Sequence, residues 1–171
     1  MDIKSLIQNV PDFPKPGIVF KAISPLLQSV EGYRQVIDTF ALRYAKAQLD
    51  TVIGIESRGF LFASTLAYVL KLPLALVRKH GKLPHPKISH TYDLEYGSDT
   101  IELHDSAIQA GSRVLLIDDL LATGGTALAA CQLIEKMGGT VVEVATVIEL
   151  AALGGRERLQ KYDVYSQTVY D

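Results

Sequence analysis

Residues 114–126 read Val-Leu-Leu-Ile-Asp-Asp-Leu-Leu-Ala-Thr-Gly-Gly-Thr. A short apolar run, typical of a buried strand, leads to two adjacent acids, and a Thr-Gly-Gly-Thr turn then opens a helical pattern over 124–137. Ligands of open α/β sheets bind at the carboxyl ends of strands. A helix N-terminus offers unpaired N–H groups and a partial positive charge, which suit a phosphate. The stretch therefore predicts a strand–turn–helix unit that holds a phosphate.

The side chains of this stretch suit two parts of one ligand. The two glycines of the turn 123–126 let the backbone approach a phosphate closely, and its two threonines add hydroxyl donors. Asp118 and Asp119 would repel a phosphate, but they suit ribose hydroxyls, bound directly or through a metal-bound water. Together these features predict a ribose 5-phosphate site. A tight turn with two solvated acids is the plainer alternative, which the order of acids, glycines and threonines disfavours. The Walker and G-x-G-x-x-G patterns are both absent.

Strands and helices alternate on both sides of this stretch, as the apolar spacing shows. The expected elements are a helix at 31–48, strands at 51–55 and 74–77, a helix at 59–70 between them, and strands at 113–117 and 140–148 around the helix at 124–137. Such alternation predicts an α/β fold, a single domain with a mainly parallel central sheet flanked by helices.

Residues 79–104 break this alternation. Pro84 and Pro86 interrupt the segment, and strand-like pieces occupy 91–96 and 100–104. We expect a long mobile loop and a short hairpin here. Loops longer than about 12–15 residues in compact domains are usually functional or disordered.

Composition limits the class of protein. A chain of 171 residues fits one domain, and 48% hydrophobic with 21% charged residues is typical of a globular chain with a core. A net charge of −2 gives no general attraction to nucleic acid or to an anionic membrane. Cys131, the only cysteine, excludes an intramolecular disulfide and is interpreted as an inert core thiol. No signal-peptide pattern is present and no apolar run reaches the ~18 residues of a membrane span, so a cytoplasmic protein is expected.

Five separated stretches resemble the type I phosphoribosyltransferases, and in particular the adenine branch of that family. They are residues 12–20, 54–60, 78–84, 92–97 and the phosphate motif 114–126. The phosphate motif is shared across the superfamily, whereas the first and fourth stretches point to the adenine branch. The resemblance implies purine salvage, in which the 5-phosphoribosyl group of phosphoribosyl pyrophosphate is joined to adenine to give AMP and pyrophosphate. It also implies Mg²⁺ as cofactor, held mainly through the substrate, and a homodimer.

The resemblance assigns roles residue by residue. The ribose phosphate would be bound by Asp118, Asp119, Ala122, Thr123, Gly124, Gly125 and Thr126. The pyrophosphate would be bound by Ser57, Arg58, Arg78, Lys79 and Lys82. Glu95 and Arg58 would be catalytic, and Tyr96 would cover the site. Adenine would be read by Val19, Phe20 and Lys21 in a base-recognition hood segment, residues 1–30. Residues 79–104 would form a flexible loop and hairpin over the site, which excludes water when it closes.

Physical chemistry agrees with part of these assignments. A guanidinium is a bidentate donor for phosphate oxygens, and Ser57–Gly59 follows the strand at 51–55 directly. Alone, Arg58 would be interpreted as a surface charge, but beside the phosphate turn a functional role is favoured. A generic basic loop remains the alternative for the cations at 78–82, and an exposed hairpin acid remains the alternative for Glu95.

Two positions depart from the family pattern, and two other functions compete. Ala22 stands where Asp is expected, which bears on base preference, and Ala63 stands where Gly is usual. A 6-oxopurine or xanthine transferase would be distinguished by the base consumed. A non-catalytic sensor of phosphoribosyl pyrophosphate would carry an additional nucleic-acid-binding region. The five-residue spacing of His80, His85 and His90 matches no common metal-ligand pattern.

Overall fold

The computed structural model describes residues 2–93 and 97–171. The chain divides into two compact units, residues 1–42 and 43–171.

The first unit is built on a small hairpin. Its strands, β1 (Gln8–Pro11) and β2 (Val19–Ala22), pair antiparallel. The other elements are η1 (Ile3–Leu6), α1 (Ser24–Gln28) and α2 (Val30–Tyr44), the last of which runs across the division between the units. The predicted helix at 31–48 is confirmed as far as Tyr44.

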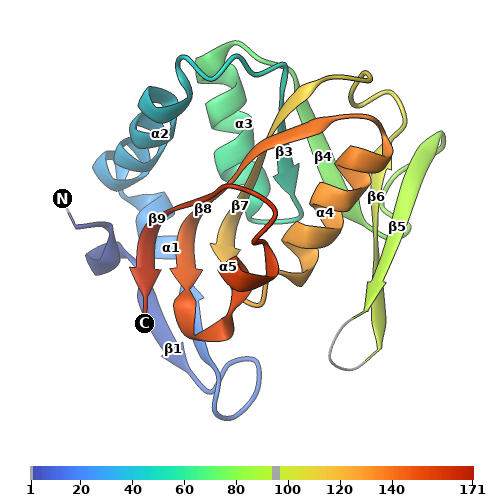
Figure 1. The fold of residues 1–171 in the computed structure, drawn as a ribbon. Coiled ribbons are helices and arrows are strands. Elements are labelled where there is room, and N and C mark those ends of the chain that lie inside the picture. Colours follow the sequence, from blue (N-terminus) through green and yellow to red (C-terminus); the bar gives the residue numbers. More distant parts are fainter. Residues whose placement is uncertain (1, 94–96) are drawn as a thin grey trace. The chain divides into compact units, whose positions relative to one another are not determined.

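The second unit contains a seven-stranded sheet in the order β5-β6-β4-β3-β7-β8-β9 (Figure 1). Its strands are β3 (Thr51–Ile55), β4 (Leu74–Lys79), β5 (Lys87–Asp93), β6 (Ser98–His104), β7 (Arg113–Leu121), β8 (Thr140–Leu150) and β9 (Val164–Tyr170). Its helical elements are α3 (Gly59–Leu70), α4 (Gly125–Lys136), η2 (Ala151–Leu153) and α5 (Gly155–Arg158). The neighbouring strands in the row β4-β3-β7-β8-β9 pair parallel. Strand β6 pairs antiparallel with both β4 and β5. The prediction of a mainly parallel sheet flanked by helices is confirmed.

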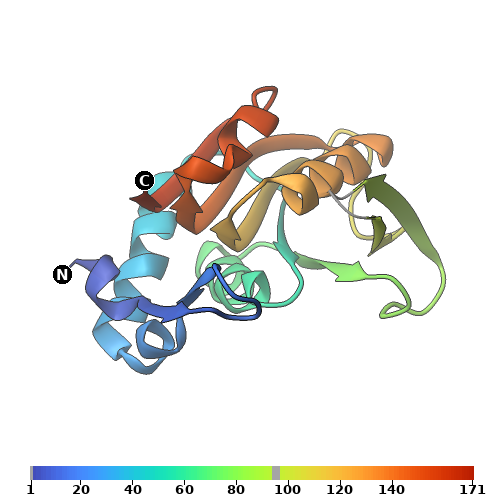
Figure 2. The same ribbon diagram turned by 90° about the horizontal axis from the view of Figure 1, so that it is seen from below.

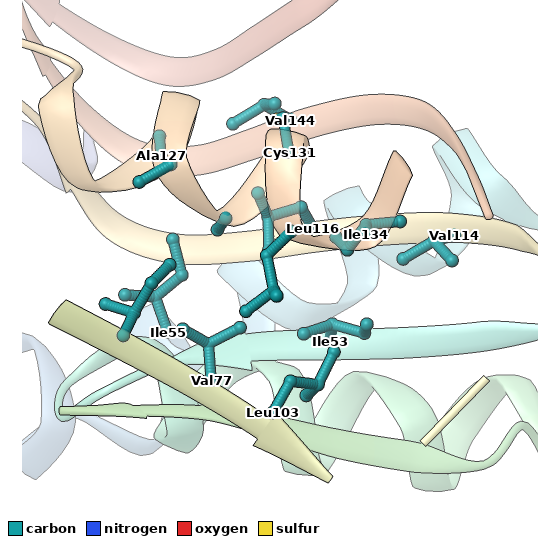
Figure 3. Close-up of a cluster of buried hydrophobic side chains, with 14 of the residues drawn as sticks. Ile53, Ile55, Val77, Leu103, Val114, Leu116, Ala127, Cys131, Ile134 and Val144 are labelled. Carbon is teal, nitrogen blue, oxygen red and sulfur yellow. The ribbon is translucent and has the colours of Figure 1, made fainter. Parts of the chain in front are cut away.

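Helices α3 and α4 lie on opposite faces of this sheet (Figure 2). Successive side chains of a strand point to opposite faces. Ile53, Ile55 and Leu116 accordingly join the apolar cluster with α4 (Figure 3). Gly54 faces α3 instead, where a Cβ would lie 2.7 Å from the Cβ of Ala63. The methyl group of Ala63 is therefore accommodated because residue 54 has no side chain.

Strand β7 is longer than its apolar pattern predicted. The expected strand ended at 117, whereas β7 continues to Leu121, with Asp118 opposite Thr146 of β8. Ladder hydrogen bonds use backbone groups, so the pairing continues through two charged residues. The prediction that both acids follow the strand was therefore wrong, since they lie among the last four residues of β7.

The segment 79–104 is mostly sheet. Strand β5 begins at Lys87 and β6 at Ser98, and β6 pairs with β4, so the expected long loop is limited to residues 80–86. Ile88, His90 and Tyr92 are half-buried whereas Ser89, Thr91 and Asp93 are exposed, which is the alternation of a strand with one face packed. The stretches 87–90 and β9 are strands that the sequence analysis did not identify.

Within the described residues, every helix is too short or too polar to span a lipid bilayer.

Candidate active site

A cavity of about 360 Å³ opens where β3 and β7 end. It is lined by Glu56, Ser57, Arg58, Lys79, Asp118, Asp119 and Leu120. Because β4, β3 and β7 are parallel neighbours, their carboxyl ends meet at one edge of the sheet. Five residues that the sequence analysis placed in two separate binding groups therefore surround one space.

Arg58 and the acid pair form the charged centre of this cavity. Nη2 of Arg58 lies 2.9 Å from Oδ2 of Asp119, and Oδ1 of Asp118 accepts the N–H of Asp119 at 2.8 Å. Asp119 is buried, with 5% of its surface exposed, and Asp118 is half-buried. The Glu56–Ser57 peptide bond that precedes Arg58 is cis.

The two acids ionise less readily than free aspartate. Burial raises the pKa of Asp118 well above its usual range, and the charge of Asp119 raises it further. Burial also raises the pKa of Asp119, although the guanidinium of Arg58 acts in the opposite direction. Two carboxylates thus face one cation, so a ligand that donates hydrogen bonds or carries positive charge would be stabilised here.

Glu56 joins the end of β4 to the turn after β3. Its Oε2 accepts the Nε–H of Arg78 at 3.0 Å and the backbone N–H of Lys79 at 2.8 Å. Burial opposes ionisation, but these two hydrogen bonds lower the pKa of Glu56. The guanidinium of Arg78 is therefore engaged with Glu56 and does not line the cavity. Lys82 is exposed in the following turn and also lies outside the lining.

The backbone of α5 packs closely against the turn that follows β7. Gly124 adopts a left-handed conformation with φ of 76°. A Cβ on Gly124 would lie 2.8 Å from the carbonyl oxygen of Gly155, and a Cβ on Gly155 would collide with the carbonyl oxygen of Ala122. Both positions therefore require glycine for the backbones to approach so closely. On the other side of the turn, Oγ1 of Thr126 lies 3.0 Å from Oη of Tyr92.

Glu102 of β6 holds the turn that carries Lys82. Its side chain is fully buried, and its oxygens contact Nδ1 of His80 at 2.9 Å, Nζ of Lys87 at 2.9 Å and the N–H of Gly81 at 3.1 Å. The hydrogen bond from Lys87 is the main cause that lowers the pKa of Glu102 to about 2. An ionised carboxylate with these partners fixes the start of the 80–86 loop.

The residues predicted to read the base lie in the first unit, on β2. Val19 is exposed, and the ring of Phe20 packs edge-to-face on Phe13 with 5.2 Å between centroids. Nζ of Lys21 donates to Oδ1 of Asn9 at 2.7 Å. The structure describes this strand within its own unit only. Their role in base recognition therefore stays a prediction.

Two predicted residues, Glu95 and Tyr96, fall outside the described residues, so their roles stay predictions. Cys131 is buried in α4, and burial raises the pKa of its thiol to about 12, as an inert core thiol requires. In the described ranges, no cluster of three or more His, Cys, Asp or Glu side chains could hold a metal ion.

Four residues of this site were missed by the sequence analysis. Glu56 and Leu120 line the cavity, while Tyr92 and Gly155 support the turn 123–126. Glu56 directly precedes Ser57 at a strand end, and the Gly154-Gly155 pair after β8 is a signal of close backbone approach. Leu120 and Tyr92 lie in the stretches 114–126 and 92–97 that carry the family resemblance, but no role was assigned to either.

Comparison with known proteins shows the family. The model of the phosphoribosyl transferase domain matches residues 26–170. The adenine phosphoribosyltransferase of Roseiflexus castenholzii is 54% identical over 170 residues, which are 99% of each chain. The crystal structure of the enzyme of the same name from Thermoanaerobacter pseudethanolicus has a TM-score of 0.95 and 43% identity, covering 99% of this chain and 98% of that one.

A third relative was crystallised with ligands. It is the adenine phosphoribosyltransferase of Saccharomyces cerevisiae, complexed with D-2,5-dideoxy-2,5-imino-altritol 1,6-bisphosphate and adenine. It has a TM-score of 0.92 and 40% identity, covering 96% of both chains. These matches, together with the cavity at the ends of β3 and β7, show that the chain belongs to the phosphoribosyltransferase family and, within it, to the adenine phosphoribosyltransferases.

Proposed function

We propose that this chain transfers the 5-phosphoribosyl group from phosphoribosyl pyrophosphate to adenine and releases AMP and pyrophosphate. The observation that carries the proposal is the meeting of Arg58 with Asp118 and Asp119 at one cavity, beside the strand that leads into the turn 123–126. The family match runs from residue 26 to 170, across both units, and supports one transferase domain over 1–171.

Each group of residues has a part of the donor to bind. The 5-phosphate lies on residues 122–126 at the N-terminus of α4, where backbone N–H groups and threonine hydroxyls donate to it. Asp118 and Asp119 accept hydrogen bonds from the ribose hydroxyls, which offsets their surplus of negative charge. Ser57, Arg58 and Lys79 bind the pyrophosphate. Lys82 joins them when the 80–86 loop closes, and Arg78 joins by leaving Glu56.

The reaction breaks the bond between the anomeric carbon and the pyrophosphate oxygen and forms a bond from that carbon to a ring nitrogen of adenine. The bonding pair leaves with pyrophosphate, positive charge develops on the ribose, and adenine finally loses a proton. The protein contributes mainly by holding nucleophile and leaving group in line. Glu95 is the residue we assign to the proton, and Tyr96 to covering the site.

The donor set fits a magnesium ion that is held mainly by the substrate. Asp118 and Asp119 supply the hard carboxylate oxygens that Mg²⁺ prefers, and two carboxylates with substrate oxygens are its usual ligands. Bound there, Mg²⁺ would neutralise charge on the ribose and pyrophosphate oxygens. This role is supported by the position of Asp118, whose pKa is raised first by burial and then by the charge of Asp119, because a cation bound there would offset both effects.

The remaining assignments rest on the family. Val19, Phe20 and Lys21 read adenine, supported by the presence of adenine in the yeast relative's complex. Backbone donors and acceptors suit adenine, and a 6-oxopurine would leave them mismatched. A cytoplasmic homodimer without nucleic-acid or membrane partners completes the proposal.

The test is the formation of AMP and pyrophosphate from phosphoribosyl pyrophosphate and Mg²⁺, with adenine, hypoxanthine, guanine or xanthine as acceptor. Turnover with adenine alone is expected. Turnover with a 6-oxopurine would overturn the base assignment, and Ala22→Asp would be the first substitution to make. Binding of the donor without turnover on any base would show a sensor rather than an enzyme.

A further inference from the structure

The β5–β6 hairpin is connected to the first turn of α4 through one hydroxyl group. Oη of Tyr92 lies 3.0 Å from Oγ1 of Thr126 and 3.4 Å from Oδ2 of Asp99. Tyr92 and Asp99 are directly opposite each other in the hairpin. A single side chain therefore contacts both the phosphate turn and an acid of the hairpin.

The number of protons limits how these contacts can be made. A hydroxyl carries one hydrogen, and a carboxylate carries none and only accepts. Both contacts are hydrogen bonds only if Thr126 donates to Tyr92 and Tyr92 donates to Asp99. If Tyr92 donates to Thr126 instead, its contact with Asp99 has no proton.

A bound phosphate demands the opposite direction. Its oxygens also only accept, so Thr126 must donate to the phosphate and then needs a donor for its own oxygen. We propose that phosphate binding reverses the direction of the hydrogen bond between the hydroxyls of Tyr92 and Thr126. Tyr92 is then a positioning residue that donates to Thr126 only when it no longer donates to Asp99. The phosphate and Asp99 thus compete for one chain of hydroxyls, and binding at the turn changes how the hairpin is held. This inference rests on the proposed function, which places the 5-phosphate at Thr126.

The hydroxyl can be removed without loss of the packing around it. The ring of Tyr92 packs against the apolar core, and its Cε2 lies 3.8 Å from the position of a Cβ on Gly125. Strand β5 has a second connection to α4, from His90 Nε2 to Gln132 Oε1 at 3.0 Å. Tyr92→Phe therefore keeps the hairpin on α4 and deletes only the hydroxyl.

The experiment measures the Kd of ribose 5-phosphate by calorimetry for the parent, Tyr92→Phe, Asp99→Asn and the double variant. Tyr92→Phe is expected to weaken binding about 2- to 10-fold, the effect of one ordinary hydrogen bond. Asp99→Asn is expected to strengthen binding, because the amide can donate to Tyr92 and no longer competes for its proton. The control is Tyr162→Phe, which removes a hydroxyl that bonds Glu135 in the last turn of α4, and this variant should bind as the parent does.

The double variant separates the proposal from a simple charge effect. If the competition runs through Tyr92, the gain from Asp99→Asn disappears in the Tyr92→Phe background. A gain of the same size in both backgrounds would overturn the proposal, because it would come from the removed charge alone. Weaker binding in both single variants would also overturn it, by showing a merely structural network. If the parent does not bind ribose 5-phosphate, the proposed function itself fails, and the coupling with it.

Discussion

The second unit removes carboxylates from water at two places, at Glu102 and at the pair Asp118 and Asp119, and their pKa values shift in opposite directions. Glu102 accepts hydrogen bonds from Lys87 and Gly81 and contacts Nδ1 of His80, and its pKa is lowered to about 2. Asp118 and Asp119 share the one guanidinium of Arg58, and the pKa of each is raised.

The comparison shows that the number of hydrogen-bonding and charged partners, and not burial, distinguishes a structural acid from a ligand-binding one. Oε2 of Glu102 accepts hydrogen bonds from Gly81 and Lys87, and Nδ1 of His80 lies 2.9 Å from Oε1, so a ligand would have to displace these partners. The acid pair has more acceptor oxygens than donors and lines an open cavity. A buried charge without sufficient partners costs stability, and a substrate that supplies hydrogens offsets that cost.

The strongest test of this comparison is Asp119→Asn. The variant should lose on the order of 100-fold in kcat/KM for phosphoribosyl pyrophosphate, because hydrogen bonds to a charged group contribute roughly 1.5–3 kcal/mol each. Its urea midpoint at neutral pH should stay equal to that of the parent or rise, since like-charge repulsion is relieved. Asp38→Asn, at an exposed ion pair with Arg34, is the matched control for both measurements. Parent-like kinetics would remove Asp119 from the site.

A smaller effect on catalysis, with the opposite effect on stability, is expected for Glu102→Gln. The amide retains the shape of the side chain but leaves the ammonium of Lys87, which is 11% exposed, without its countercharge. The urea midpoint should fall, and kcat/KM should change by less than about tenfold, through looser placement of the 80–86 loop. A variant as stable as the parent would show that the three partners of Glu102 do not fix this turn.

The subtlest test uses pH. The folded-state pKa of Asp118 is raised above its ordinary value of 3.8, so the folded chain binds that proton more tightly and this group costs stability as pH rises above 3.8. The folded-state pKa of Glu102 is lowered from 4.5 to about 2, so its contribution is complete above 4.5 and is lost as pH falls towards 2. The unfolding free energy of the parent minus that of Glu102→Gln should rise with pH below about 4.5, whereas the parent minus Asp118→Asn should fall as pH rises above about 3.8. Two slopes of the same sign would contradict the distinction between the two acids.

The repeating elements of the fold could be predicted because they depend on apolar spacing. Strand 51–55, helix α4 and the start of the strand at 113 were placed correctly, and with them the location of Asp118 and Asp119 at one edge of the sheet. The end of β7 could not be predicted, because pairing with β8 continues through charged residues.

The residues that pack behind the site were harder to predict from the sequence than the residues that line it. Tyr92 contacts Thr126, and Gly155 contacts the backbone of Ala122, through pairings about thirty residues apart. Such pairs follow from the packing of α4, β5 and α5 in space, which no local pattern encodes. The family resemblance supplied candidate residues, but not the ion pairs among them.

The order of strands in the sheet also has a consequence for the growing chain. Strand β3 lies between β4, which follows it closely, and β7, whose partner residues come about sixty positions later. Long-range parallel pairing forms slowly, and an unpaired apolar strand edge promotes association with other chains. Until β7 has left the ribosome, β3 presents such an edge. A nascent chain that stalls before residue 113 should therefore be the species that most needs a chaperone.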